Sequence, residues 1–288
     1  MKLASLQGLR GPVVAARDEA GGYRSLSDVD PTLGTDVGQL LATGPEWRSR
    51  AEAALRQAPP VEPTAFRPLI PRPPKMLCLG LNDADHAREG NFPIPDYPAI
   101  FARVASSLIG HQQPMLRPPE CEQLDYEVEL AVVVGRGGRR IRAADALDHV
   151  AGYSVFNDGT IRAYQRKTSQ WTIGKNWHGT GALGPELVTA DELPPGANGL
   201  ELSTWVDGER LQDGNTSSMI FSVARTIELL SEVLVLEPSD VVAMGTVRGV
   251  GHARNPPRWL CPGETVRAAI ERIGTIENPI VDEIVSEE

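Results

Sequence analysis

The stretch Asp125-Tyr126-Glu127-Val128-Glu129-Leu130-Ala131-Val132-Val133-Val134 decides the fold, because it is typical of a strand with two different faces. Side chains alternate between the faces of a strand, so Glu127 and Glu129 point the same way, roughly 6–7 Å apart at their bases. The opposite face is apolar and fixes the register. It consists of Tyr126, Val128, Leu130, Val132 and Val134. Two carboxylates on one face can converge on a single cation.

A third acid, Asp158, follows in Asn157-Asp158-Gly159. Carboxylate ligands and the lack of a Cys/His cluster favour Mg²⁺ or Mn²⁺ over zinc, with Ca²⁺ as an alternative occupant in a crystal. An isolated E-x-E pair more often marks a solvated strand face. The prediction of a metal site therefore depends on the other residues around this pair.

Composition narrows the function classes. The chain has 288 residues and a formal net charge of −10, which argues against nucleic-acid binding because phosphate recognition needs clustered Lys and Arg. The three cysteines have neither metal-binding nor redox spacing, and no apolar stretch approaches the length of a membrane span. We therefore expect a cytoplasmic protein that binds neither nucleic acid nor membrane.

The pattern along the chain predicts an α+β, β-rich protein. Short strands and a helix near 46–57 indicate a small N-terminal α/β domain at 1–58, and seven prolines between 59 and 74 indicate an extended linker. From 75 to 288 short apolar strands dominate, and one clear helix is predicted over 222–234. This longer part is the second, larger predicted domain.

Two further features carry chemical groups. His86 and Glu89 are three residues apart, so on a helical turn they would share a face and could act as an imidazole–carboxylate pair, although a surface turn is the alternative. Lys175 lies near two tryptophans and could stabilise a negative charge, or lie on the surface over an aromatic ring. The G-x-G-x-x-G match at 179–184 is followed by Pro185 and opens no helix, so nucleotide binding is not supported.

Taken in order, these segments resemble the fumarylacetoacetate hydrolase superfamily over about residues 75–279. The matching segments are 80–89, 124–135, 152–158, 170–171, 174–175, 183–185, 207–209, 214–217, 219–221 and 245–246, together with Gln212. The resemblance implies a catalytic domain of the mixed β-sandwich roll type, assembled as a homodimer. Departures occur at Val247 and Arg248, where proline usually follows Gly245-Thr246, and in the segments after Asp158 and Lys175.

The resemblance also implies roles for individual residues. Glu127, Glu129 and Asp158 would hold the metal, while His86 and Glu89 would lie on a lid that closes over the substrate. Lys175 matches the active-site lysine of the family. Residues implied to contact substrate are Arg103, Arg162, Gln165, Gln212 and Thr246. Arg103 stands where many relatives have lysine, and its guanidinium could bind a substrate carboxylate.

The predicted reaction is hydrolytic carbon–carbon cleavage of a 2,4-dioxo acid, such as an acylpyruvate or a fumarylacetoacetate-like β-diketone, to a 2-oxo acid and a carboxylic acid. The predicted partner is thus a small anionic 2-oxo or 2,4-dioxo acid. The same metal and enolate chemistry also fits an oxaloacetate-type decarboxylase or a 2-oxo acid isomerase or hydratase. A metal-binding protein without catalysis is the third alternative.

Overall fold

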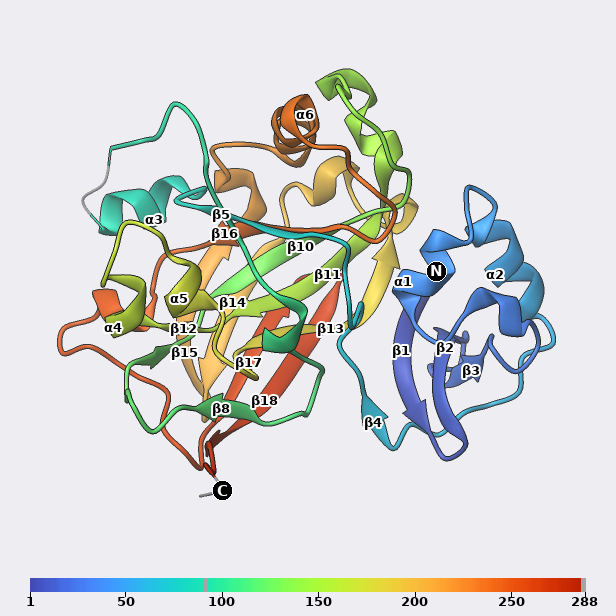
Figure 1. Ribbon diagram of the computed structural model, residues 1–288, viewed down its shortest axis with the longest axis horizontal. Helices are drawn as coiled ribbons and strands as arrows, with labels where there is room; N and C mark the ends of the chain where they lie inside the picture. Colours follow the sequence, from blue (N-terminus) through green and yellow to red (C-terminus); the bar gives the residue numbers. More distant parts are fainter. Residues whose placement is uncertain (91–92, 286–288) are drawn as a thin grey trace.

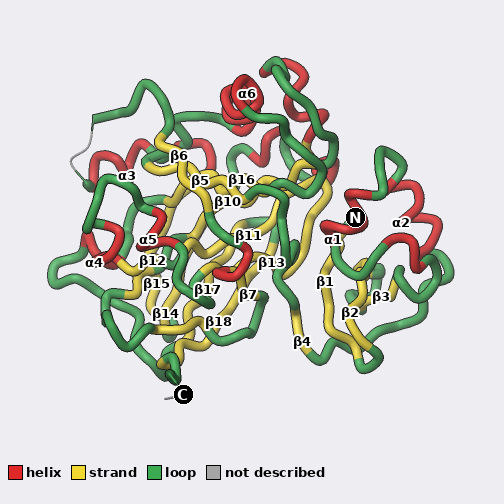
Figure 2. Tube along the Cα trace, in the orientation of Figure 1, coloured by secondary structure: helices red, strands yellow, loops and turns green. Residues whose placement is uncertain are grey.

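The computed structural model describes residues 1–90 and 93–285, and within them strands dominate (Figures 1 and 2). The largest sheet has 11 strands, with β4 pairing with β1, β7 pairing with β13, and the remaining strands in the order β3-β2-β1-β13-β11-β10-β16-β5-β6. A second sheet has the order β15-β14-β17-β18-β8, and β12 pairs with β9. The mixed, sheet-rich architecture confirms the predicted fold class.

The strands of the N-terminal half are β1 (Lys2–Gly8), β2 (Gly11–Arg17), β3 (Tyr23–Ser25), β4 (Ala65–Phe66), β5 (Met76–Gly80), β6 (Ala99–Ala102), β7 (Leu108–Ile109), β8 (Met115–Arg117), β9 (Leu124–Asp125) and β10 (Val128–Val134). Those that follow are β11 (Val150–Asp158), β12 (Thr160–Ile161), β13 (Gly181–Thr189), β14 (Glu201–Val206), β15 (Glu209–Asn215), β16 (Val241–Thr246), β17 (Thr265–Ile270) and β18 (Gly274–Asp282). The helices are α1 (Val37–Ala42), α2 (Trp47–Leu55), α3 (Ala84–Glu89), α4 (Arg162–Gln165), α5 (Thr172–Lys175) and α6 (Val223–Val233).

Strand β10 is buried on both faces, and its alternation separates two cores. The predicted apolar strip, Tyr126 to Val134 in steps of two, packs with residues of β11, β14, β17 and β18 in the core between the two large sheets. Ala131 and Val133 belong to a second core on the other face, together with residues of β1, α1 and α2. The register predicted from the sequence is therefore confirmed, and Glu129 lies on the face opposite the apolar strip.

The N-terminal segment extends the large sheet, because β1 pairs antiparallel with β13 through Lys2 and Val188. In Figure 1 β1, β2, β3, α1 and α2 lie together at one side of the molecule. Within the proline-rich segment, β4 pairs with β1. The boundaries 1–58, 59–74 and 75–288 stay a prediction, and residues 91–92 and 286–288 of the last range lie outside the described residues.

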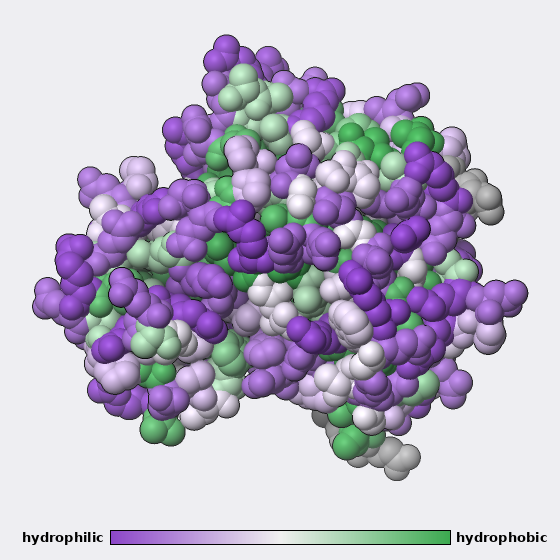
Figure 3. Space-filling view, turned by 180° about the vertical axis from the view of Figure 1, so that it is seen from behind, coloured by the Kyte–Doolittle hydropathy of each residue, from purple (hydrophilic) through white to green (hydrophobic). Residues whose placement is uncertain are grey.

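Helix α6 confirms the helix predicted over 222–234, since Ser222 caps it through a bond from the Arg225 N–H and it ends at Val233. On the face shown in Figure 3 hydrophilic side chains predominate, and apolar ones form small groups. Among the described residues, no helix is both long and apolar enough to cross a membrane.

Candidate metal centre and active site

Glu127, Glu129 and Asp158 come together as the sequence predicted. One carboxylate oxygen from each lies within 4.8 Å of the others, and all three residues are buried. Antiparallel pairing of β10 with β11 produces this cluster, because Val128 lies opposite Asn157. This register places Glu127, which precedes Val128, beside Asp158, which follows Asn157. The Asp158 N–H donates to the carbonyl oxygen of Glu127 over 2.9 Å.

The backbone around the cluster is held by side chains and by a glycine. Asn157 Oδ1 accepts a hydrogen bond from the Glu127 N–H at 3.0 Å, and Glu129 Oε2 accepts one from the Gly245 N–H at 3.0 Å. Gly245 has a φ of 87°, and a Cβ atom there would lie 2.9 Å from the Cβ atom of Asn82. This position therefore requires glycine if the Glu129 carboxylate is to be held by the backbone.

Three cations compensate the cluster: Lys175, Arg162 and Arg103. Lys175 donates from Nζ to Glu127 Oε2 and to Asp158 Oδ2, both at 2.6 Å. Arg162 forms an ion pair with Glu127 and another, at 2.8 Å, with Asp125. Because all these groups are buried, their charges interact strongly.

The acids of the cluster differ in pKa. Burial and the negative charges of Asp158 and Glu127 raise the pKa of Glu129 well above its ordinary value. Burial also acts to raise the pKa of Glu127, but Arg162 and Lys175 outweigh burial and lower it. Three buried carboxylates at this spacing form an oxygen donor set that suits a hard divalent cation.

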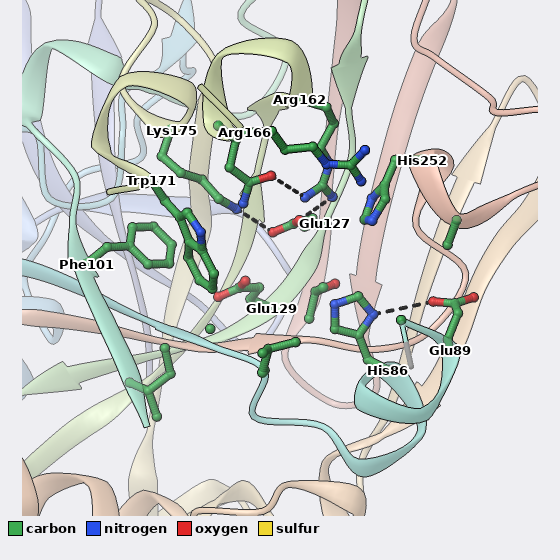
Figure 4. A pocket seen from close by; sticks show the side chains of 17 residues that line it. His86, Glu89, Phe101, Glu127, Glu129, Arg162, Arg166, Trp171, Lys175 and His252 are labelled. Atoms are coloured by element: carbon green, nitrogen blue, oxygen red, sulfur yellow. Dashed lines mark hydrogen bonds and ion pairs between the residues drawn. The ribbon is translucent and has the colours of Figure 1, made fainter. Parts of the chain in front are cut away.

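A cavity of about 170 Å³ opens over the cluster (Figure 4). Eight predicted site residues line it: His86, Glu89, Glu127, Glu129, Arg162, Gln165, Lys175 and Thr246. Phe101 and Trp171 form one wall, with their ring centroids 5.6 Å apart in an edge-to-face arrangement, and Lys175 Nζ lies 5.2 Å from the Phe101 centroid. Lys175 is buried beside this wall and does not lie on the surface, which was the alternative.

His86 and Glu89 occur on helix α3, as their spacing predicted. Asp83 caps the helix by accepting bonds from the N–H groups of Asp85 and His86. The His86 Nδ1 atom lies 3.4 Å from Glu89 Oε2, and Glu89 Oε1 accepts the Gly249 N–H at 3.0 Å. Burial acts to raise the pKa of Glu89, but the bonds from His86 and Gly249 outweigh burial and lower it. Glu89 is therefore suited to orienting His86 as a carboxylate.

Three predicted residues are not among the described residues that line the cavity. Asp158 is buried and bonded to Lys175. Arg103 forms an ion pair with Asp158 and donates to Ser107, Thr180 and the Gly159 carbonyl. Gln212 accepts from the Val128 N–H at 2.9 Å and donates to Thr246 Oγ1 at 2.9 Å. Substrate contacts by Arg103 and Gln212 stay predictions. In this structure Arg103 pairs with Asp158, and Gln212 bonds to Val128 and Thr246.

Sequence reasoning missed His252, which lines the cavity from a short 3-10 helix at Gly251–Ala253. Its Nδ1 atom lies 3.3 Å from the buried Asp125. Asp125 stands 127 positions earlier in the chain, so no local spacing could reveal the pair. Arg166, also missed, lines the same cavity beside α4.

The comparisons with known proteins agree with this geometry. Residues 75–281 match the family model described as fumarylacetoacetate (FAA) hydrolase, C-terminal. The human mitochondrial oxaloacetate tautomerase FAHD2A is 40% identical over 91% of this chain and 84% of its own length.

Two solved structures share the fold across nearly the whole chain. Fumarylacetoacetate hydrolase from psychrophilic Exiguobacterium antarcticum is 31% identical, with a TM-score of 0.86 over 98% of this chain and 100% of its own. 5-Carboxymethyl-2-hydroxymuconate delta-isomerase from Mycobacterium smegmatis is 28% identical, with a TM-score of 0.77 over 99% and 100%. By sequence and fold, this chain belongs to the fumarylacetoacetate hydrolase superfamily of enzymes.

Proposed function

We propose that this enzyme catalyses keto–enol tautomerisation of a small 2-oxo acid of the oxaloacetate type, with a divalent metal as cofactor. The size of the cavity is the observation that carries this choice of substrate. Its volume of about 170 Å³ is well below the roughly 300–1,000 Å³ of pockets that enclose drug-sized ligands. An acid of a few carbon atoms suits it better than a long acyl chain. The 40% identity to an oxaloacetate tautomerase supports the same class.

The residues of the cavity divide the work. Glu127, Glu129 and Asp158 would hold the metal, which supplies a Lewis acid for the 2-oxo acid group when bound. Lys175 places an ammonium group beside the same position, where it stabilises negative charge that develops on the substrate. His86, oriented by Glu89, gives or takes the proton that moves between oxygen and carbon.

Hydrolytic cleavage of a 2,4-dioxo acid is the second candidate, and the His86–Glu89 pair favours it. An imidazole held by a carboxylate can also take a proton from water, which then attacks a carbonyl carbon. His86→Ala separates decarboxylation from these two reactions. Hydrolysis and tautomerisation both need this proton transfer and should collapse, whereas decarboxylation of an oxaloacetate-like acid could survive.

The test is a comparison of reactions with Mg²⁺, with Mn²⁺ and with EDTA. The decay of enol ultraviolet absorbance is followed for oxaloacetate and for a panel of acylpyruvates, and pyruvate is measured in parallel. Metal-dependent enol decay of oxaloacetate without pyruvate formation supports tautomerisation. Cleavage of acylpyruvates into two acids would show that the enzyme is a hydrolase. Formation of pyruvate from oxaloacetate would show that it is a decarboxylase. Metal binding with no turnover at all would leave a non-catalytic metal protein.

Three finer predictions belong to the same proposal. The donor set of three carboxylates suits Mg²⁺ and Mn²⁺ equally, so the metal comparison above decides between them. A homodimer is expected from the family resemblance, and light scattering of the purified protein tests it. A cytoplasmic location is the third, and fractionation of cells tests it.

A further inference from the structure

The loop from Val247 to Ala253 is anchored to two carboxylates on different parts of the chain. The Gly249 N–H donates to Glu89 of helix α3 at 3.0 Å. The Gly251 and His252 N–H groups donate to the two oxygens of Asp125 at 2.8 and 3.0 Å. These bonds hold the backbone on both sides of His252 without using its imidazole.

Asp125 can act only as an acceptor toward the imidazole. Its Oδ1 atom already accepts the Tyr126 and Gly251 N–H groups, and its Oδ2 atom accepts Arg162 Nε and the His252 N–H. The His252 Nδ1 atom, 3.3 Å from Oδ2, must therefore carry a hydrogen. In a neutral ring with its hydrogen on Nδ1, the free lone pair is on Nε2. Asp125 does not bond to Nε2, so this nitrogen can accept a proton.

His252 and His86 reach the same cavity from different elements. Both rings are drawn on one side of the cavity in Figure 4, with the arginine side chains of the α4 region beside His252. Each imidazole has a carboxylate partner through Nδ1, Glu89 for His86 and Asp125 for His252. Two such pairs facing one small cavity allow one ring to accept a proton while the other donates one.

We propose that His252 is a second proton-transfer residue of this active site and that Asp125 is its positioning residue, an inference that rests on the proposed tautomerisation. In the enol-to-keto direction the enol O–H bond breaks and its proton passes to Nε2 of His252. The oxygen lone pair forms the C=O bond, and the electron pair of the C=C bond takes a proton from the His86 ring at the neighbouring carbon. His252 finishes with the proton from the enol oxygen, and His86 lacks the proton that it gave to the carbon. Loss of a proton from His252 to water and uptake of one from water by His86 restore both rings.

The kinetic test compares His252→Gln with His149→Gln, a matched change of a histidine outside the cavity. Loss of a proton-transfer group lowers kcat by about 10²-fold or more. We expect this loss for His252→Gln with little change in KM, and unchanged kinetics for His149→Gln. A raised KM with the kcat of the original protein would make His252 a binding residue and would overturn the proposal.

A second measurement does not need turnover. Long-range ¹H–¹⁵N spectra of the ¹⁵N-histidine protein report the tautomer of each ring, and His252→Gln identifies the His252 signals. We expect a hydrogen on Nδ1, loss of that preference in Asp125→Asn, and a shift of the Nε2 signal when Mg²⁺ and 3,3-difluoro-oxaloacetate are added.

A failure of the role proposed for His252 can be distinguished from a failure of the proposed function. A hydrogen on Nε2, or no response of the ring to the analogue, overturns the role of His252 even if oxaloacetate is tautomerised. If the original protein is inactive on every 2-oxo acid tested, the proposed function fails instead.

Discussion

The ammonium group of Lys175 lies 2.6 Å from Oε2 of Glu127, inside a region from which solvent is excluded. Burial disfavours the charged lysine, but Asp158 and Glu127 outweigh burial and raise the pKa of Lys175. The acids of the cluster are therefore balanced by a permanent positive charge of the chain itself. A divalent metal ion would add two further positive charges at the same place.

Lys175→Met should destabilise the protein most when metal is absent. Removing one partner of a buried ion pair costs about 3–5 kcal/mol, because the remaining carboxylates lose their counter-charge. Excess Mg²⁺ should recover part of this loss, since the ion neutralises the same acids. Urea unfolding with EDTA and with Mg²⁺ measures both quantities. The exposed Lys167→Met is the control, and an equal loss with and without Mg²⁺ would show that no ion binds there.

Glu127→Gln should weaken divalent metal binding and remove metal-dependent turnover. The substitution keeps the size of the side chain but removes one of the three anionic ligands proposed for the metal, and Arg162 and Lys175 then lose a partner. We expect at least a tenfold loss of Mn²⁺ affinity, measured by calorimetry. Loss of a group that only orients a metal ligand already lowers metal affinity by about 10–100-fold. Glu209→Gln changes an exposed glutamate in the same way and should bind metal normally. Full activity of Glu127→Gln would refute the assignment of the metal ligands.

Arg103→Met should act through Asp158. The guanidinium is buried, pairs with Asp158 and also donates to Thr180 Oγ1 at 2.9 Å. Its loss should lower the free energy of unfolding by about 3–5 kcal/mol and reduce metal affinity. The exposed Arg139→Met should change neither. If Arg103→Met instead raises KM for the acid while metal affinity and stability stay normal, the substrate contact expected from the sequence is correct.

Local patterns predicted those parts of the site that lie close together in the sequence. The alternation of β10 places Glu127 and Glu129 correctly, and the three-residue spacing places His86 beside Glu89. Both relations follow from the geometry of a single strand or helix. The metal role proposed for Asp158 came from the family resemblance, and the pairing of β10 with β11 explains why its carboxylate lies beside the other two.

What the sequence did not reveal depends on contacts between distant segments. His252 reaches Asp125 across 127 positions, and Arg103 reaches Asp158 across 55. A histidine in a glycine-rich loop and an arginine after a short strand look like surface residues when read locally. The burial of Arg103 and the partners of both residues follow from the way distant segments pack together, which periodicity does not encode.

Asp125→Asn should change how stability depends on pH. Burial acts to raise the pKa of Asp125, but Arg162 and His252 outweigh burial and lower it from 3.8 to about 2. A folded-state pKa below the unfolded one stabilises the protein above pH 3.8, and this contribution is lost as pH falls through about 2. At about 1.4 kcal/mol per pKa unit it amounts to roughly 2 kcal/mol.

The measurement is urea unfolding of the original protein and of Asp125→Asn between pH 6 and pH 2. The difference in the free energy of unfolding between the original protein and Asp125→Asn should be largest at pH 6. It should shrink by roughly 2 kcal/mol toward pH 2, because the Asp125 carboxylate takes up a proton there and the asparagine amide does not. Asp148→Asn, at an exposed position, should follow the original protein at every pH. An advantage that stays constant over the whole range would mean that Asp125 has an ordinary pKa and that the carboxylate shared by Arg162 and His252 contributes through packing alone.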